Sequence, residues 1–148
     1  MYNTTLCYIT RGDEVLMLHR VKKKNDINKD KWIGIGGKFL PDETPQACVL
    51  REAFEETGLT IENPRLCGVK EWENQDGSRY IVMLYKTNNF SGKLHDSAEG
   101  PVFWATREEI LSMQMTEHFD KMMEIFFRED LSEFYYQKTT NRYTIQML

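Results

Sequence analysis

The chain has 148 residues, of which 41% are hydrophobic and 28% are charged, and its formal net charge is −4. This length suits a single domain over residues 1–148, and the negative charge disfavours a polynucleotide partner, because phosphate backbones are held by basic surfaces. No apolar run approaches the roughly 20 residues that span a bilayer, and the first residues lack the basic start of a secretory signal. We therefore expect a cytoplasmic protein with no membrane partner.

The cysteines are Cys7, Cys48 and Cys67, an odd number without metal-ligand spacing. In a cytoplasmic protein this pattern favours reduced thiols over disulfides. A nucleophilic role for Cys48 would need an activating base, and the sequence shows none. We assign no chemistry to the cysteines.

The first part of the chain predicts two strands and a polar loop. Residues 5–9 and 14–21 are rich in β-prone side chains and are joined by a turn at 11–13. Residues 22–31 are polar and lack periodicity, which indicates a loop. Its lysines are usually solvated, but the loop comes just before a glycine turn, so Arg20 or Lys23 can reach a bound polyphosphate. A short strand at 32–35 follows.

Residues 45–57 predict a helix with signals at both ends. Thr44 can cap the N-terminus, Pro45 suits the first helical position, and Gly58 can adopt the left-handed conformation that ends a helix. At about 100° per residue, one side of the helix is predicted to pack. That side carries Ala47, Leu50, Ala53, Phe54 and Thr57. The opposite side carries three carboxylates, Glu52, Glu55 and Glu56.

The carboxylate side of this helix is poorly arranged for stability. Acids in the last turn oppose the helix macrodipole by roughly 0.3–1 kcal/mol each, and like charges at i,i+3 and i,i+4 also repel. A divalent cation would compensate, and the Gly36-Gly37 turn would let a backbone carbonyl approach the same ion. The alternative is a solvated acidic surface on which Arg51 pairs with Glu55. Composition alone does not decide between the two.

The rest of the chain predicts further strands and two helices. Strands at 65–72 and 80–87 are joined by a turn at 74–77, residues 90–100 form a loop, and a strand follows at 102–104. Thr106 can cap a helix at 107–113, and a second helix at 117–128 carries an apolar stripe typical of a core. Two β-prone runs at 134–138 and 142–146 favour a closing hairpin.

The spacing of the residues between 37 and 59 is the most specific signal in the chain. Gly37 is followed after five residues by Glu43 and, after seven more, by the run Arg51-Glu52-Ala53-Phe54-Glu55-Glu56-Thr57-Gly58-Leu59. This pattern resembles the Nudix box at every fixed position, and Ala53 is the weakest match because it is only marginally hydrophobic. The resemblance implies a Nudix hydrolase with the α/β/α sandwich of that family, a mixed β-sheet flanked by helices.

By this resemblance, the acidic residues lie around one or more Mg²⁺ ions, with Mn²⁺ as a substitute. The implied metal ligands are the carbonyl of Gly36 and the side chains of Glu52, Glu55, Glu56 and Glu99. Glu43 and Arg51 resemble the pair that braces the loop against the helix. The metal would neutralise phosphate oxygens and activate water, while Glu55, Glu56 or Glu99 takes the proton. The sequence does not choose among these three bases.

The resemblance also implies substrate-binding residues on both sides of the box. Trp32 and Ile33 fall where purine-selective members line the base pocket, and Lys38 belongs to the same approach. Some members carry Asn at the place of Ile33, and an isoleucine side chain cannot form the hydrogen bond that this Asn makes with a purine. Residues 114–118 occupy the region of base-reading acids, where Glu117 is assigned that task ahead of His118.

The implied substrate is a small-molecule nucleotide. The specific expectation is an oxidised purine nucleoside triphosphate such as 8-oxo-dGTP, cleaved to monophosphate and pyrophosphate. The same box serves enzymes that cut ADP-ribose, dinucleoside polyphosphates and RNA 5′ ends, so these remain alternatives. A nucleotide-sensing domain without catalysis is a further alternative, but such domains often have a damaged box and this one keeps all its acids. Monomer and homodimer are both open.

Overall fold

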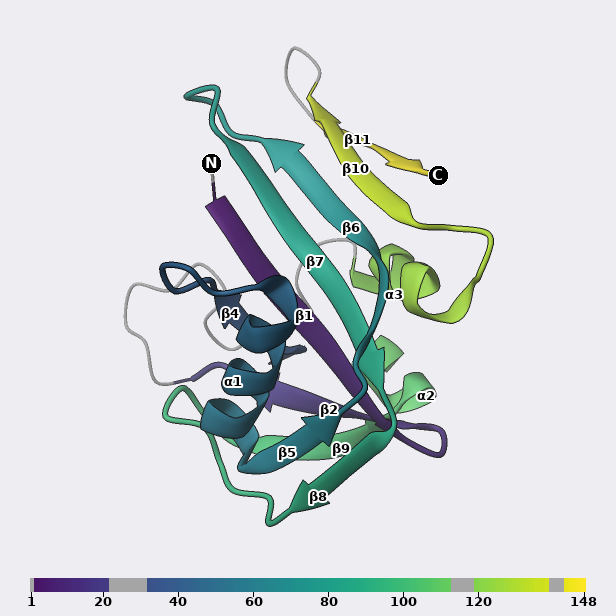
Figure 1. Ribbon diagram of the computed structural model, residues 1–148. Coiled ribbons are helices and arrows are strands. Elements are labelled where there is room, and N and C mark those ends of the chain that lie inside the picture. The colour runs from purple at the N-terminus through teal and green to yellow at the C-terminus, as the bar shows by residue number, and fades with distance from the viewer. Residues whose placement is uncertain (1, 22–31, 113–118, 139–142) are drawn as a thin grey trace.

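A mixed β-sheet forms the centre of the fold, and helices lie on both of its faces (Figure 1). The computed structural model describes residues 2–21, 32–112, 119–138 and 143–148. The first strands are β1 Tyr2–Arg11, β2 Glu14–His19, β3 Trp32–Ile33, β4 Ile35–Lys38 and β5 Leu59–Glu62. They are followed by β6 Arg65–Glu73, β7 Arg79–Thr87, β8 Asn89–Gly92, β9 Val102–Thr106, β10 Glu133–Lys138 and β11 Tyr143–Met147. The helices are α1 Pro45–Thr57, α2 Arg107–Ser112 and α3 Phe119–Phe127.

The strand β1 connects the glycine-containing strand β4 to the rest of the sheet. Within the described residues, nine strands form one sheet in the order β11-β10-β6-β7-β1-β2-β3, with β4 paired to β1 and β9 paired to β2. β1 runs parallel to β7 and β10 runs parallel to β6, whereas the other pairs are antiparallel. The sheet is therefore mixed, as the sequence predicted.

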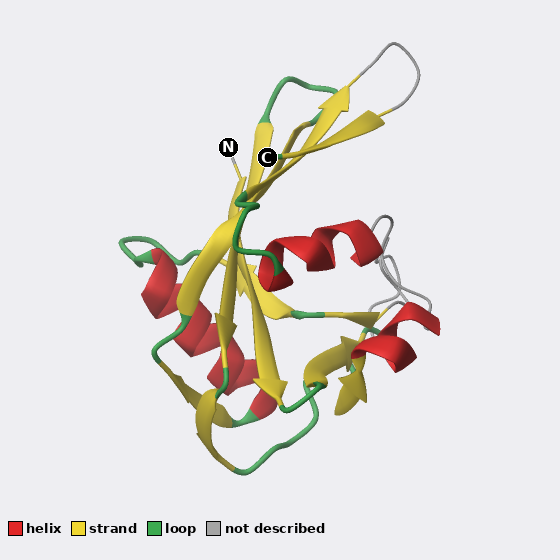
Figure 2. Ribbon diagram, turned by 90° about the vertical axis from the view of Figure 1, so that its right-hand side faces the viewer, coloured by secondary structure: helices red, strands yellow, loops and turns green. Residues whose placement is uncertain are grey.

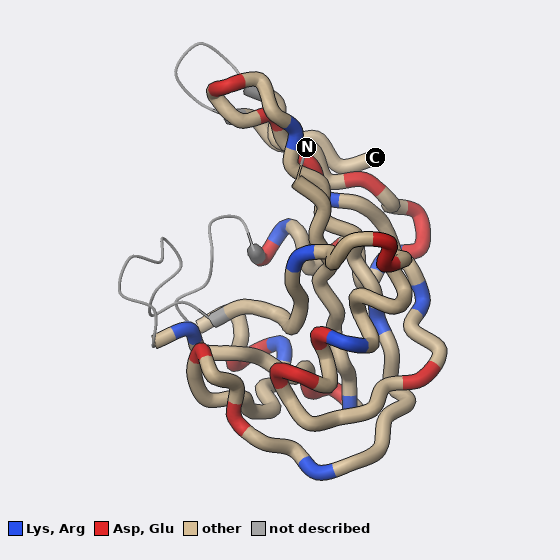
Figure 3. Tube along the Cα trace, turned by 60° about the vertical axis from the view of Figure 1, so that its left-hand side comes forward, with Lys and Arg blue, Asp and Glu red and all other residues tan. Residues whose placement is uncertain are grey.

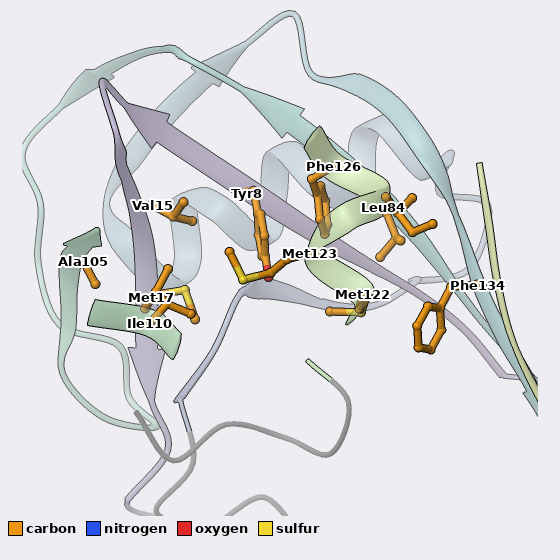
Figure 4. Close-up of a cluster of buried hydrophobic side chains, with 11 residues drawn as sticks. Tyr8, Val15, Met17, Leu84, Ala105, Ile110, Met122, Met123, Phe126 and Phe134 are labelled. Carbon is orange, nitrogen blue, oxygen red and sulfur yellow. The ribbon is translucent and has the colours of Figure 1, made fainter. Parts of the chain in front are cut away.

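The helices divide the core into two buried clusters. Figure 2 shows α1 on one face of the sheet and α2 and α3 on the other. On the α3 side, Tyr8 stacks on Phe126 with ring centroids 3.8 Å apart, and Leu84 and Phe134 complete the packing (Figure 4). On the α1 side, Val49 and Ala53 of the helix are in a second cluster of buried side chains. Together these layers confirm the predicted α/β/α sandwich.

The ends of α1 form as their sequence signals predict. Thr44 has extended backbone angles, and its Oγ1 accepts a hydrogen bond from the Ala47 N–H at 3.1 Å. Pro45 occupies the start of the helix, and Gly58 ends it at φ 80° with its N–H donating to the Phe54 carbonyl at 2.9 Å. These local interactions fix where the helix begins and ends.

The predicted packing side of α1 is right for Ala53 and Thr57 but wrong for Ala47, Leu50 and Phe54. Its buried residues are Cys48, Val49, Ala53 and Thr57, whereas Leu50 is 36% and Phe54 57% exposed. On the helical projection, Glu52 and Glu56 lie between Cys48 and Val49, so these carboxylates face the sheet rather than bulk water. The helix presents its smaller apolar side chains to β1 and β4 because the two layers approach closely, as the 3.4 Å contact between Cys48 Sγ and Thr5 Oγ1 shows.

Two short strands lie where the sequence predicted no strand. Asn89–Gly92 begins just before the predicted loop at 90–100, but it pairs with Leu59–Glu62 to form a separate two-stranded sheet. Leu59 and Ile61 are buried there, and Phe90 packs against the same cluster. The closing hairpin of β10 and β11 is confirmed, and β10 adds it to the sheet beside β6.

Charged residues of both signs are interspersed along the trace (Figure 3). Among the residues that the structure describes, no helix has the length and apolar character required to cross a bilayer.

The core assignment can be tested with two phenylalanines. Phe126→Ala removes a ring that is 2% exposed and stacks on Tyr8, so we expect the free energy of unfolding to fall by about 3–5 kcal/mol. Phe54→Ala removes an exposed ring, and we expect a change of less than about 0.5 kcal/mol. Urea denaturation measures both, and equal losses would contradict the observed orientation of α1.

Candidate active site

The strand β4 places two glycines beneath α1. In the antiparallel ladder, Gly36 lies opposite Leu6 and Gly37 opposite Thr5. A Cβ at Gly37 would collide with the Glu52 carboxylate, and a Cβ at Gly36 would collide with the Thr5 carbonyl. Glycine at position 37 therefore allows the carboxylate of Glu52 to lie directly against the backbone of β4.

Arg51 holds the acidic side chains around the start and middle of α1. Its guanidinium forms a bidentate pair with Glu43, with Nε–Oε2 at 2.7 Å and Nη2–Oε1 at 2.9 Å. Nη1 reaches Glu52 at 2.7 Å and Glu55 at 3.1 Å, and Nη2 also donates to the Lys38 carbonyl at 3.0 Å. One cation thus connects the loop after β4 with three carboxylates.

Glu43 is locked in this arrangement as an anion. Hydrogen bonds from Arg51, together with one from the Leu40 N–H, lower the pKa of Glu43 to about 2. Hydrogen bonds to Glu43 and Glu52 raise the pKa of Arg51. The structure brings Glu43 and Arg51 together in the geometry expected of a brace between the loop and the helix.

Glu56 has a different environment, because it is largely buried and forms no ion pair with the described residues, although Arg20 lies near enough to act on it. Its Oε2 atom is buried and has no hydrogen-bond partner among the described residues. Burial raises the pKa of Glu56 well above the ordinary value, and the neighbouring Glu52 and Glu99 raise it further, while Arg20 lowers it. A carboxyl group in these surroundings is uncompensated when ionised.

The segment before β9 brings Glu99 toward Glu56. The backbone of Glu99 is anchored to the end of β2, since its carbonyl accepts from the Val21 N–H at 3.0 Å. Ser97 Oγ accepts a hydrogen bond from the Glu99 N–H at 3.1 Å. The Glu99 carboxylate lies 3.8 Å from Arg20 Nε. Two elements far apart in sequence therefore place an acid and a cation close to the end of α1.

This donor set fits a hard divalent cation. Carboxylate and carbonyl oxygens are the ligands that Mg²⁺ and Mn²⁺ prefer. The unsatisfied Oε2 of Glu56 and the Glu52 carboxylate seated on Gly37 supply such oxygens. Among the described residues, no three His, Cys, Asp or Glu side chains already converge as metal ligands. Two of the carboxylates are instead paired with Arg51, which forms ion pairs with Glu52 and with the exposed Glu55.

The structure places the predicted substrate-binding residues as follows. Arg20 lies beside Glu99, and Lys38 is exposed at the end of β4. Ile33 is partly buried and packs against the α1-side cluster, opposite Leu18, so its side chain contributes to the core. Lys23 and Glu117, together with His118, lie outside the described residues, as does the side chain of Trp32.

The sequence did not predict the residues whose hydrogen bonds hold β4 and the segment of Glu99 in place. Cys48 Sγ donates weakly to the Gly37 and Lys38 carbonyls at 3.6 Å, and it contacts Thr5. Asp96 Oδ1 accepts from the Val102 N–H at 3.1 Å, which fixes the segment carrying Glu99. A helical projection centred on Glu52 and Glu56 would have drawn attention to Cys48, but no pattern in the sequence singles out Asp96.

Comparisons with known proteins identify the family of the chain. The model of the NUDIX domain family matches residues 2–128. The uncharacterized Nudix hydrolase YvcI of Bacillus subtilis (strain 168) is 28% identical over 120 residues, which cover 78% of this chain and 72% of the relative. The oxidized purine nucleoside triphosphate hydrolase of Danio rerio is 30% identical over 112 residues, covering 75% and 70% of the two chains.

A solved structure shows the same fold. The MutT protein from Bacillus halodurans superposes with a TM-score of 0.80 at 24% identity, over 99% of this chain and 97% of that one. The family match covers most of the residues described above, including β4, α1 and the segment that carries Glu99. The chain therefore belongs to the NUDIX domain family, as a hydrolase that acts on pyrophosphate bonds.

Proposed function

We propose that the protein hydrolyses purine nucleoside triphosphates, specifically oxidised ones such as 8-oxo-dGTP, to the monophosphate and pyrophosphate. Nudix enzymes act on small-molecule nucleotides and generally use divalent metals. The relative from Danio rerio is named for the hydrolysis of oxidised purine nucleoside triphosphates, and it aligns with 75% of this chain. The observation that carries the site assignment is the buried Oε2 of Glu56, which no described residue satisfies, next to the Glu52 carboxylate that lies against Gly37.

The chain's own residues suit this reaction, in which water adds across the anhydride between the α- and β-phosphates. Glu52, Glu55, Glu56, Glu99 and the Gly36 carbonyl would hold Mg²⁺ or Mn²⁺. When bound, such a cation neutralises phosphate oxygens and activates water. Arg20 would contact phosphate oxygens from the side of Glu99, and Lys38 from the end of β4.

The proton of the attacking water would pass to Glu55, Glu56 or Glu99. Burial raises the pKa of Glu56 to about 9 while no cation is bound, so the group is then protonated at pH 7. Glu56 is the favoured acceptor because a divalent cation at the site would lower this pKa and leave a carboxylate that can take the proton. Glu43 is excluded from this role by its pKa of about 2 and its bidentate pair with Arg51. Arg51 and Glu43 would instead keep the loop and helix in register during turnover.

A substrate panel tests the proposed reaction. With Mg²⁺ or Mn²⁺ present, we expect 8-oxo-dGTP to give the highest kcat/KM in a panel with dGTP, dATP, ADP-ribose and diadenosine tetraphosphate. The products, separated by chromatography, should be the monophosphate and pyrophosphate. Faster hydrolysis of ADP-ribose than of every purine triphosphate would overturn the substrate assignment. As a control, Glu56→Gln should lose a factor on the order of 10² or more in kcat with its circular dichroism spectrum unchanged.

The buried state of Glu56 also predicts a pH dependence of stability. Because its pKa is raised in the folded protein, the folded state holds a proton that the unfolded chain has released above about pH 4.3. The contribution of Glu56 to the free energy of unfolding is therefore greatest below about pH 4.3, and it is lost as the pH rises toward the raised pKa of the folded state. The measurement is made in the presence of a metal chelator. The free energy of unfolding of Glu56→Gln minus that of wild type should increase between pH 5 and pH 8 by at least about 1.4 kcal/mol, which is equivalent to one pKa unit.

Urea denaturation at a series of pH values measures this difference. Glu62→Gln is the matched control, since Glu62 is exposed and lies at the end of β5. A stability difference between Glu56→Gln and wild type that does not change with pH would show that Glu56 is solvated in the folded protein.

A further inference from the structure

A row of aromatic side chains crosses the sheet on the face that α3 partly covers. The registers place Tyr2 beside Tyr80, Tyr80 beside Trp72, and Trp72 beside Tyr136 on four neighbouring strands. Trp72 and Tyr80 stack with centroids 4.4 Å apart and an interplanar angle of 7°. Tyr2 is 46% exposed and the other three are partly exposed. Partly exposed aromatic faces are surfaces on which planar rings stack.

Lys70 lies between this row and the buried core. Its Nζ is 5.4 Å from the Trp72 ring, 5.8 Å from the Phe134 ring and 5.3 Å from the Tyr136 ring. Within the described residues its ammonium group has no carboxylate partner and no hydrogen-bond acceptor. Burial lowers the pKa of Lys70 to about 8, so the group is still protonated at pH 7. The three rings attract the cation but accept no conventional hydrogen bond, so its donors are available to a ligand.

The same sheet face leads from Lys70 to the glycine strand. Lys70 pairs with Val82, Val82 with Thr4, and Thr4 with Lys38 of β4. Three strand spacings of about 4.8 Å separate β6 from β4, or about 14 Å in total. Among the described strands β4 pairs with β1 alone, and Gly36 and Gly37 carry no side chains at that edge. A nucleotide that crosses this edge would have its phosphates beside Glu52 and its base on the face of Lys70.

We propose that Lys70 is a specificity-determining residue that donates a hydrogen bond to a carbonyl oxygen on the base of the bound nucleotide, an inference that rests on the proposed function. An ammonium group only donates hydrogen bonds, so it favours an acceptor such as the O6 atom of guanine. At the same position adenine presents an amino group, which also donates, and the two donors repel. Lys70 thereby selects keto purines, a class that includes 8-oxoguanine.

Three variants test this assignment. Lys70→Met keeps the length of the side chain but removes the donors, and Lys70→Arg keeps donors at the same place. Lys93→Met makes the same replacement at an exposed lysine away from this face. Thermal unfolding checks the fold of each variant, and Lys70→Met should retain it because methionine suits a largely buried position among aromatic rings.

The readouts are kcat/KM for dGTP and dATP and the dissociation constants of their α,β-methylene analogues, measured by calorimetry. We expect Lys70→Met to reduce the preference for guanine over adenine by about 10- to 100-fold, the scale of one base-reading contact. The effect should appear in KM and in the dissociation constants rather than in kcat. Lys70→Arg should restore part of the preference, and Lys93→Met should keep all of it.

Equal losses on both bases, or no loss, would assign Lys70 a structural or phosphate-binding role and overturn the proposal. Failure of wild type to bind either analogue would overturn it as well. The analogues also separate this proposal from the proposed function. If wild type binds them with a Lys70-dependent guanine preference but cleaves no purine triphosphate, the reaction is wrong and the role of Lys70 stands.

Discussion

The candidate site depends on the burial of carboxyl groups where α1 meets the glycines of β4. Glu52 lies against Gly37, and Glu56 projects toward the sheet with a buried oxygen that no described residue satisfies. Leaving a carboxylate in such surroundings costs free energy, which the well-formed caps of α1 and its packing on β1 and β4 must offset. We propose that this arrangement accommodates a positively charged ligand at that position.

The acidic residues around α1 divide into two groups by their partners. Glu43 is bound bidentately by Arg51, which holds its pKa low and makes it part of the scaffold. Glu56 and Glu99 lie near Arg20, on the side away from this brace, and there the pKa of Glu56 is raised. The same residue type therefore serves as a structural anion in one place and as a candidate base or metal ligand in the other. The local environment of each glutamate, rather than its position in the motif alone, decides which of these two roles it has.

Local signals in the sequence were sufficient for the ends of α1, because Thr44 and Gly58 act within one turn of the helix. The choice of which side of the helix packs was not local. Leu50 and Phe54 are the larger apolar residues, yet the close approach of α1 to β1 places Cys48 and Val49 inside instead. The β5–β8 pair was missed for a similar reason, since four-residue strands are identified by a partner about 30 residues away.

The candidate site was predictable to the extent that it follows the box. Glu43, Arg51, Glu52 and Glu55 come together because they share one loop and one helix. The approach of Glu99 depends on hydrogen bonds between β2 and the segment before β9, which no motif encodes. Lys70 was overlooked because a single lysine in a strand usually points to solvent. Only the register of β6 with β7 and β10 reveals its three aromatic neighbours.

The most direct test of a cation site between α1 and β4 is anomalous scattering from Mn²⁺ in crystals grown with a non-hydrolysable purine nucleotide. We predict an anomalous peak within coordination distance of Glu52, Glu56 and the Gly36 carbonyl, with a phosphate oxygen of the nucleotide as a further ligand. A map in which these glutamates turn toward bulk water, with no peak beside them and the phosphates bound elsewhere, would contradict the account.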